Sequence, residues 1–326
     1  RRFDSDLSLQ FMKFLVTGSC GFIGFHLCRN LLKEEHEVLG IDNLNRYYDV
    51  DLKRTRLKLL KSFKNFKFCN EDLINKEPVS LLFKDFKPII VVNLAAQAGV
   101  RYSAINPNSY LDSNVIGFLN IIDLCREFEI KKLIYASSSS VYGSSKDVPY
   151  KEVSSPNPIS IYGKTKLINE KITESSANQN CFNSIGLRFF TVYGPYGRPD
   201  MAYYKFSKKI KENSKIKIFN KGNMSRDMTY IDDIIQGIKL VIQAENLIEP
   251  HEIFNLGNTK PIKTMDLLSL IESHYKKKAS VEYEDSKNEV EITHADISKA
   301  NSMIGYLPKI DFTEGMANFF SWFDNQ

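Results

Sequence analysis

The sequence contains no apolar run long enough to cross a membrane. A spanning helix needs about 18 or more apolar residues, and the longest candidates, such as 89–96, stop far short. The first ten residues also lack a hydrophobic region of signal-peptide length. We therefore expect neither a membrane segment nor a secretory leader.

Cysteine and histidine are scarce and scattered. The five cysteines are Cys20, Cys28, Cys69, Cys125 and Cys181, and they form no C-x-x-C pair. The five histidines include no pair at i, i+4 spacing that would suit a metal. An odd number of dispersed cysteines argues against a disulfide framework and favours reduced thiols in the cytoplasm. We expect no metal site and a cytoplasmic protein.

An excess of charge of one sign is also missing. The 44 basic and 39 acidic residues are well mixed and give a net charge of +5. The densest basic cluster, 276–278, is interpreted as the solvated end of a helix, so no nucleic-acid partner is expected. With 43% hydrophobic and 25% charged residues, the 326-residue chain is typical of globular proteins. Its length predicts one large or two medium domains.

Short apolar runs alternate with helical patterns through the first half, which is typical of βαβ units and a parallel sheet. The expected strands are 13–17, 37–42, 66–70, 89–94, 133–137 and 184–190. The expected helices are 22–33, 52–61, 114–127 and 160–178. Runs that are continuously apolar fit strands buried on both faces. The fold class is therefore predicted to be α/β, with a doubly wound parallel sheet of the Rossmann type.

The second half changes character after residue 190, where turn residues cluster in 193–199. We expect a dinucleotide-binding domain at 12–190, to which 230–258 returns with a helix at 231–243 and a strand at 252–256. Segments 191–229 and 259–326 would form a smaller, discontinuous C-terminal substrate domain. Residues 1–11 precede the first periodic segment and are interpreted as an extension, natural or introduced by cloning.

A glycine-rich turn follows the first expected strand. Gly18 permits the tight turn, Gly21 lets the backbone approach a pyrophosphate, and Gly24 allows close packing of helix on strand. The helix that begins at Phe22 and Ile23 offers unpaired N–H groups to phosphates. Asp42, at the end of the second strand, suits ribose hydroxyls and would repel a 2′-phosphate. NAD is therefore favoured over NADP.

A tyrosine and a lysine stand four residues apart on an expected helix, so Tyr162 and Lys166 share one face. A phenol with a pKa near 10 is a poor base at neutral pH. A neighbouring ammonium and an oxidised nicotinamide would both favour the phenolate and lower the pKa. The serine run 137–140 ends the fifth strand, where ligands bind in parallel sheets. We expect Ser138 to relay a proton from a sugar hydroxyl to Tyr162.

Together these motifs make the chain resemble the nucleotide-sugar epimerases of the extended short-chain dehydrogenase/reductase family. The similarity runs from Met12 onward. It rests on the glycine turn, Asn93-Leu94-Ala95-Ala96, the serines before Val141-Tyr142-Gly143, the Tyr162/Lys166 pair, and Arg226-Asp227 before Tyr230-Ile231-Asp232-Asp233. Within the family, segments 42–50, 95–103 and 188–201 are most similar to UDP-glucuronate 4-epimerases.

The resemblance implies roles for individual residues. Tyr162 is the base, Lys166 lowers its pKa and holds the nicotinamide ribose, and Ser138 and Ser139 complete the catalytic set. The implied NAD-binding residues are Gly18, Gly21, Phe22, Ile23, Gly24, Asp42, Asn43, Asp72, Leu73, Leu94, Ala95, Ala96, Tyr162 and Lys166. The implied substrate-binding residues are Arg101, Ser138, Ser139, Ser140, Tyr162, Thr191, Arg198 and Arg226. Of these, Arg226 would bind the diphosphate and either Arg101 or Arg198 a sugar carboxylate.

The implied reaction is NAD-dependent inversion at C4 of a UDP-sugar, from UDP-glucuronate to UDP-galacturonate, through a transient 4-keto intermediate and NADH. Epimerisation of UDP-N-acetylglucosamine or UDP-glucose is an alternative. Decarboxylases of UDP-glucuronate and sugar 4,6-dehydratases typically carry an acidic residue where Ser139 and Ser140 stand here. A regulator that binds the dinucleotide without catalysis is an interpretation from a different class. The resemblance also implies a homodimer, joined through helices 114–127 and 160–178.

Overall fold

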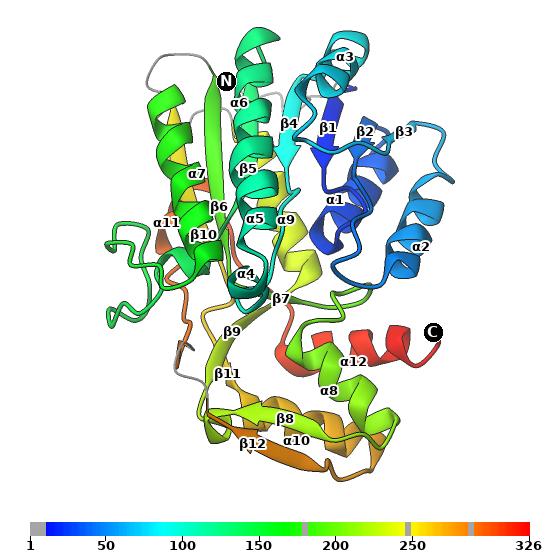
Figure 1. Cartoon of the computed structure of the whole chain (residues 1–326), viewed down its shortest axis with the longest axis vertical. Coiled ribbons are helices and arrows are strands. Elements are labelled where there is room, and N and C mark those ends of the chain that lie inside the picture. The colour runs from blue at the N-terminus through cyan, green and yellow to red at the C-terminus, as the bar shows by residue number, and fades with distance from the viewer. Residues whose placement is uncertain (1–10, 178–181, 245–248, 286–289) are drawn as a thin grey trace, which may run out of the picture.

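Seven strands form one parallel sheet at the centre of the molecule (Figure 1). The computed structural model describes residues 11–177, 182–244, 249–285 and 290–326, so Cys181 and residues 1–10 lie outside it. The strand order is β10-β6-β5-β4-β1-β2-β3. The bounds are β1 Lys13–Thr17, β2 Glu37–Ile41, β3 Phe66–Cys69, β4 Ile90–Asn93, β5 Lys132–Ser138, β6 Asn183–Phe189 and β10 His251–Leu256. The predicted doubly wound α/β fold is confirmed, and each expected strand is found within one residue of its expected ends.

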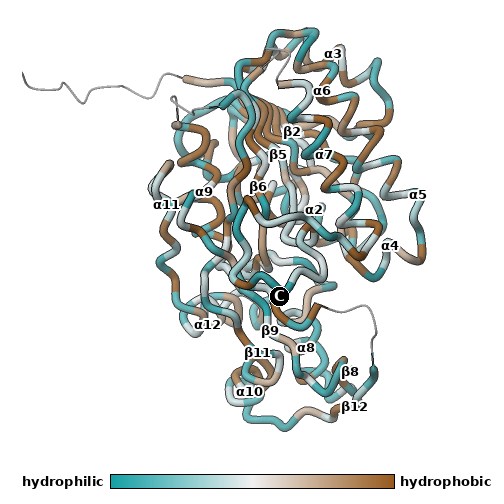
Figure 2. The backbone as a smooth tube through the Cα atoms, turned by 90° about the vertical axis from the view of Figure 1, so that its left-hand side faces the viewer, coloured by the Kyte–Doolittle hydropathy of each residue, from teal (hydrophilic) through white to brown (hydrophobic). Residues whose placement is uncertain are grey.

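Helices cover both faces of this sheet (Figure 2). Helix α1 (Phe22–Lys33) packs against α2 (Val50–Leu60) and α9 (Ile231–Gln243), and α11 (Ser298–Ile304) packs against β10. The other face carries α3 (Lys76–Phe86), α6 (Gly117–Glu127) and α7 (Ile161–Ala177). Successive strand residues point to opposite faces. Phe14 and Val16 therefore join the core beneath α1, whereas Leu15 joins the core beneath α3 and α6.

A smaller part of the molecule lies beyond the carboxyl ends of the strands (Figure 1). It holds a three-stranded sheet of β7 (Thr191–Tyr193), β9 (Ser225–Tyr230) and β11 (Pro261–Lys263). A two-stranded sheet pairs β8 (Ile216–Phe219) with β12 (Val281–Glu284). The accompanying helices are α8 (Ala202–Lys211), α10 (Thr264–Tyr275) and α12 (Phe312–Phe323). The β10 strand pairs with β6, so the chain returns to the main sheet, while the exact domain boundaries stay a prediction.

Two local features differ from the sequence pattern. The helix expected from 114 begins earlier, after the short helices α4 (Tyr102–Ile105) and α5 (Pro107–Tyr110), as a π-helical turn at Leu111–Ile116. Asn114 explains the wider turn, since its amide bonds to both main-chain groups of Gln97 and to Thr165 on α7. The basic cluster 276–278 follows the end of α10 and is exposed. None of the helices in the described ranges has the length and hydrophobicity required to cross a bilayer.

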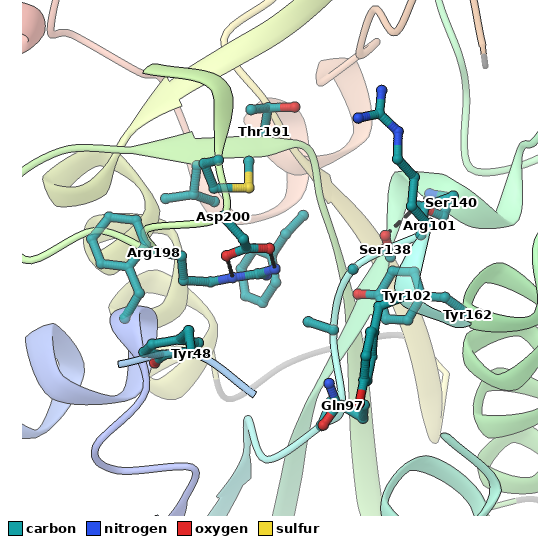
Figure 3. Close-up of a pocket in the computed structure, with 18 of the residues that line it drawn as sticks. Tyr48, Gln97, Arg101, Tyr102, Ser138, Ser140, Tyr162, Thr191, Arg198 and Asp200 are labelled. Atoms are coloured by element: carbon teal, nitrogen blue, oxygen red, sulfur yellow. Dashed lines mark hydrogen bonds and ion pairs between the residues drawn. The ribbon is translucent and has the colours of Figure 1, made fainter. Parts of the chain in front are cut away.

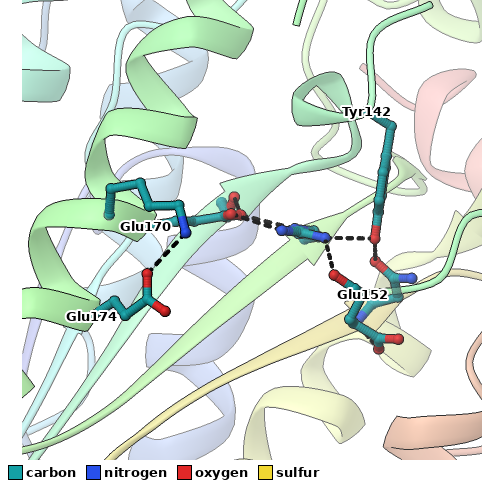
Figure 4. Close-up of polar contacts among 8 residues, drawn as sticks. Tyr142, Glu152, Glu170 and Glu174 are labelled. Carbon is teal, nitrogen blue, oxygen red and sulfur yellow. Dashed lines mark hydrogen bonds and ion pairs between the residues drawn. The ribbon is translucent and has the colours of Figure 1, made fainter. Parts of the chain in front are cut away.

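A buried ion pair fixes α7 to the main sheet (Figure 4). Glu170 on α7 receives hydrogen bonds from Nε and Nη2 of Arg188 on β6, at 2.9 and 2.8 Å, and both side chains are 5% exposed. The Ser137 hydroxyl donates to the same carboxylate. The remaining Arg188 amino group donates to the Tyr142 hydroxyl and the Glu152 carbonyl. Burial lowers the Arg188 pKa, but Glu170 outweighs this and raises it, so the guanidinium stays charged.

Replacing Glu170 by glutamine should strongly destabilise the fold, because it leaves the buried Arg188 charge uncompensated. Breaking such a pair typically costs about 3–5 kcal/mol. The control is Glu174→Gln on the same helix, which removes an exposed pair with Lys171; it should cost less than about 1 kcal/mol. Urea denaturation of both variants measures the difference. Equal free energies of unfolding would contradict the anchoring role of Glu170.

Candidate active site

One large cavity, of about 1030 Å³, opens where the strands of the main sheet end. Its wall combines the loops after β1, β4 and β5 with α7 and with residues of the smaller part. Every residue that the sequence assigned to cofactor, substrate or catalysis lines this one cavity. Their individual roles stay predictions, but residues as distant in sequence as Gly18 and Arg226 share a single site.

The glycine-rich turn fits a dinucleotide phosphate. A Cβ on Gly24 would lie 2.1 Å from the Gly18 carbonyl oxygen, and one on Gly18 would lie 2.7 Å from the Ala95 nitrogen. Gly18 also has a φ of 66°, which favours glycine. The turn can therefore bring its backbone close to a ligand only without side chains. It leads directly into α1, whose first residues Phe22 and Ile23 also line the cavity.

The part of the cavity wall beyond the glycine-rich turn carries the groups expected to hold the adenosine. Asp42 is 8% exposed and accepts hydrogen bonds from the backbone of Cys20 and Leu44. These bonds fix the carboxylate at the cavity wall. Asn43 donates to Asp72 at 2.7 Å, which joins the second and third strand ends. Leu73 follows Asp72, and Leu94, Ala95 and Ala96 follow β4 along the same wall. A carboxylate held there suits a ribose that carries free hydroxyls.

Tyr162 and Ser138 lie close together in the cavity (Figure 3), and Lys166 also lines it. Burial raises the Tyr162 pKa, and a hydrogen bond with Ser138 partly offsets that rise. The Ser138 hydroxyl also accepts from the Ser140 amide at 3.1 Å. Lys166 is 1% exposed and donates to the Ala136 carbonyl at 2.9 Å. Its Nζ lies 5.9 Å from the centre of the Tyr162 ring.

In the chain alone, Ser138 and Arg198 lower the Tyr162 pKa against the effect of burial, and the role expected of Lys166 stays a prediction. At that distance the ammonium is not among the groups that shift Tyr162, and burial dominates. Burial also lowers the Lys166 pKa to about 8, so its own charge is weakened. A buried phenol with a raised pKa favours the neutral form. A further positive charge beside the phenol would favour its ionisation.

The sugar side of the cavity contains a second ion pair that the sequence did not reveal. Arg198 binds Asp200 through Nε, at 3.0 Å, and through Nη2. The Tyr47 hydroxyl donates to the same carboxylate at 3.1 Å. Asp200 engages the edge of the guanidinium formed by Nε and Nη2, and Arg198 also makes a hydrogen bond with the Tyr47 hydroxyl. Arg198 faces Tyr162 across the cavity, and Thr191 and the serines 138–140 complete this wall (Figure 3).

Basic side chains gather on the wall contributed by the smaller part. The guanidinium of Arg101 lies 3.6 Å from the centre of the Phe219 ring and extends away from Tyr162 (Figure 3). Arg226 on β9 donates to the Ser225 carbonyl at 3.0 Å. The same wall includes four lysines that no sequence motif indicated: Lys205, Lys209, Lys217 and Lys263. This end of the cavity suits an anionic group.

Tyr47 and Asp200 lie within segments that resembled known epimerases, so their positions were visible in the sequence although their contact was not. Val290 and Thr293 also line the cavity, at the basic end. The lysines occur at irregular spacing, and only the folded chain brings them together. The cavity therefore has a dinucleotide half, a central phenol and hydroxyls, and a basic half.

Comparison with known proteins agrees with this geometry. The model of the "NAD dependent epimerase/dehydratase family" matches residues 14–257. A UDP-glucuronate 4-epimerase of Thermodesulfobacterium geofontis is 41% identical, over 95% of each chain. The Protein CapI of Staphylococcus aureus is 40% identical, over 96% of this chain and 98% of its own. UDP-glucuronic acid 4-epimerase from Bacillus cereus, solved with UDP-glucuronic acid and NAD, superposes with a TM-score of 0.91 at 34% identity, covering 96% of this chain and 99% of that one.

The resemblance read from the sequence motifs is thus confirmed by matches that span nearly the whole chain. Since the family model covers most of the residues and relatives above 30% identity cover almost all of them, the chain belongs to the NAD dependent epimerase/dehydratase family.

Proposed function

We propose that this protein is a UDP-glucuronate 4-epimerase that uses NAD to invert C4 and form UDP-galacturonate. The observation that carries the proposal is the placement of Tyr162 and Ser138 between a glycine-lined dinucleotide half and a basic half of one cavity. A guanidinium edge faces the phenol across the cavity, where a sugar carboxylate would lie. Relatives named as UDP-glucuronate 4-epimerases support this substrate.

In the proposed reaction, Tyr162 takes the proton of the sugar O4 and later returns it, with Ser138 holding the same hydroxyl. When bound, NAD would supply the hydride chemistry at C4 and, in its oxidised form, positive charge that favours the phenolate. Lys166 would bind the nicotinamide ribose. Arg226 and the lysines of the basic half would hold the diphosphate while the sugar turns over. The protein thus supplies orientation and proton transfer.

Simple epimerisation is favoured over dehydration or decarboxylation by the acid–base groups at the sugar end. Positions 139 and 140 hold serines, so no carboxylate stands just before Val141. Burial raises the Asp200 pKa, but Arg198 outweighs it and keeps the pKa below its ordinary value. An ionised, paired Asp200 is a poor proton donor. Tyr162 is therefore the one group at this end that we assign to proton transfer.

Replacing Tyr162 by phenylalanine should lower kcat by roughly 10²–10⁴-fold, which is the usual contribution of general acid–base catalysis. Affinity for UDP should stay within about twofold, because the phenol does not contact the nucleotide in this proposal. NMR of the products from UDP-glucuronate measures turnover, and calorimetry measures UDP binding. Parallel assays with UDP-glucose and UDP-N-acetylglucosamine distinguish the alternative substrates. A Tyr162→Phe variant at full speed would overturn the proposed mechanism.

Arg198 is proposed to hold the glucuronate carboxylate. A 4-keto uronic acid is a β-keto acid, so a loosely held carboxylate is prone to leave as CO₂. Arg198→Met should therefore weaken UDP-glucuronate binding by about tenfold or more, leave UDP binding unchanged, and release a UDP-pentose. Product analysis by NMR tests both effects. Unchanged affinity together with the absence of pentose would count against this role.

We also propose a homodimer formed through α6 and α7. These helices lie side by side (Figure 1), and apolar side chains on them are exposed: Leu119 by 36% and Ile168 by 39%, with Ile116 of the preceding π-helical turn exposed by 47%. An exposed apolar face on neighbouring helices favours a self-complementary interface. The free cysteines Cys20, Cys28, Cys69 and Cys125 support the further proposal of a cytoplasmic location.

Leu119→Glu should shift the protein toward monomer, because two buried charges would face each other near the dimer axis. The matched control is Leu81→Glu, since Leu81 lies on α3 and is 60% exposed. Sedimentation velocity at micromolar concentration separates the two states. The proposed interface fails if both variants sediment like the unmodified protein.

A further inference from the structure

Arg56 is a charged side chain that is completely buried between α2 and the glycine-rich turn. It lies on α2 with 0% exposure, and within the described chain its guanidinium makes no salt bridge. Burying a charge is costly unless it is fully hydrogen-bonded. The two amino groups of Arg56 donate four hydrogen bonds, three of them to backbone carbonyls, whereas the buried Nε has no partner. Burial of this arginine therefore costs free energy of folding, which its hydrogen bonds must offset.

The two terminal nitrogens of Arg56 reach loops that are far apart in sequence. Nη1 donates to the Cys20 carbonyl, inside the glycine-rich turn, and to the Tyr48 hydroxyl, both at 2.8 Å. Nη2 donates to the carbonyls of Tyr196 and Gly197, at 2.6 and 3.1 Å. Gly197 directly precedes Arg198. One side chain therefore joins the phosphate turn to the loop that carries the proposed carboxylate ligand.

That loop needs to be held from outside. Tyr196 has a φ of 55°, a left-handed conformation that is strained for a residue with a side chain. Three consecutive carbonyls, of residues 195–197, accept bonds from the cofactor half, because His26 on α1 bonds to the Pro195 carbonyl at 2.9 Å. Burial lowers the His26 pKa to about 4, so the ring is neutral at physiological pH and donates one N–H. The cofactor half thus imposes the shape of the loop.

We propose that Arg56 is a positioning residue that ties the glycine-rich cofactor turn to the loop 195–197, and so fixes Arg198 for the sugar. The proposal rests on the proposed function only in taking Arg198 as the sugar-side ligand. A planar guanidinium spans both loops because its two amino groups point in fixed, divergent directions. A lysine ammonium carries its donors on a single nitrogen, so it could hydrogen-bond well to only one of the two loops.

The test compares Arg56→Met with Arg54→Met on the NAD-loaded enzyme. Arg54 lies on the same helix, is 68% exposed and pairs only with Asp51 among the described residues. A displacement of about 1 Å far from the chemistry can cost 10²-fold. We expect Arg56→Met to weaken UDP-glucuronate binding by roughly tenfold or more while UDP binding changes by less than about twofold. Arg54→Met should match the unmodified protein in both.

A second readout does not depend on catalysis. Hydrogen exchange of backbone amides in 195–201 should accelerate in Arg56→Met and remain unchanged in Arg54→Met, since only the former loses bonds to the loop. Arg56→Lys should give an intermediate effect on both readouts. This charge-conserving variant also keeps the test decisive where the methionine variant does not fold.

Two outcomes would overturn the inference. One is an equal loss of UDP and UDP-glucuronate affinity in Arg56→Lys, which would indicate general damage to the fold. The other is loop exchange and sugar affinity identical to those of Arg54→Met. Failure of the proposed function looks different: the unmodified enzyme would not epimerise UDP-glucuronate, yet the exchange measurement would still report whether Arg56 holds the loop.

Discussion

The buried pair of Glu170 and Arg188 is the constraint on which the centre of the site depends. Helix α7 carries Tyr162 and Lys166, and Glu170 stands one turn further along the same helix. Its carboxylate is bound both by Arg188 of β6 and by Ser137, the residue before Ser138. The same contact therefore sets the helix that bears the phenol and the strand end that bears its hydroxyl partner. Low exposure makes this geometry rigid, since any slip would leave a charge buried and unpaired.

The cavity behaves as two half-sites with different electrostatics. The dinucleotide half offers backbone groups, small side chains and the fixed carboxylate of Asp42, and this carboxylate suits a ribose with free hydroxyls. The opposite half gathers lysines and arginines, which suits a diphosphate. Tyr162 lies between them, buried and with a raised pKa. Burial therefore favours the neutral form of the phenol in the chain alone.

Sequence reasoning was most successful where function requires a particular backbone. Gly18 and Gly24 leave no room for a side chain, so the phosphate-binding turn could be predicted. The strands are apolar on both faces because they separate two hydrophobic cores, so the sheet could be predicted as well. It was least successful where function depends on distant partners. The pairing of Asp200 with Arg198 and the gathering of the lysines follow from the tertiary fold, and no spacing encodes them. The burial that raises the Tyr162 pKa is likewise a property of the fold that the sequence does not show.

The shared guanidinium at the sugar end has a consequence for selectivity. Asp200 already pairs with Arg198. A sugar carboxylate bound by this guanidinium, as proposed above, would therefore meet directed N–H groups but little net positive charge. Binding there would depend on orientation more than on attraction at a distance. Selection of a uronate over a hexose would thus come from the geometry of one guanidinium edge, and that geometry is set by the loop that Arg56 reaches from the cofactor half.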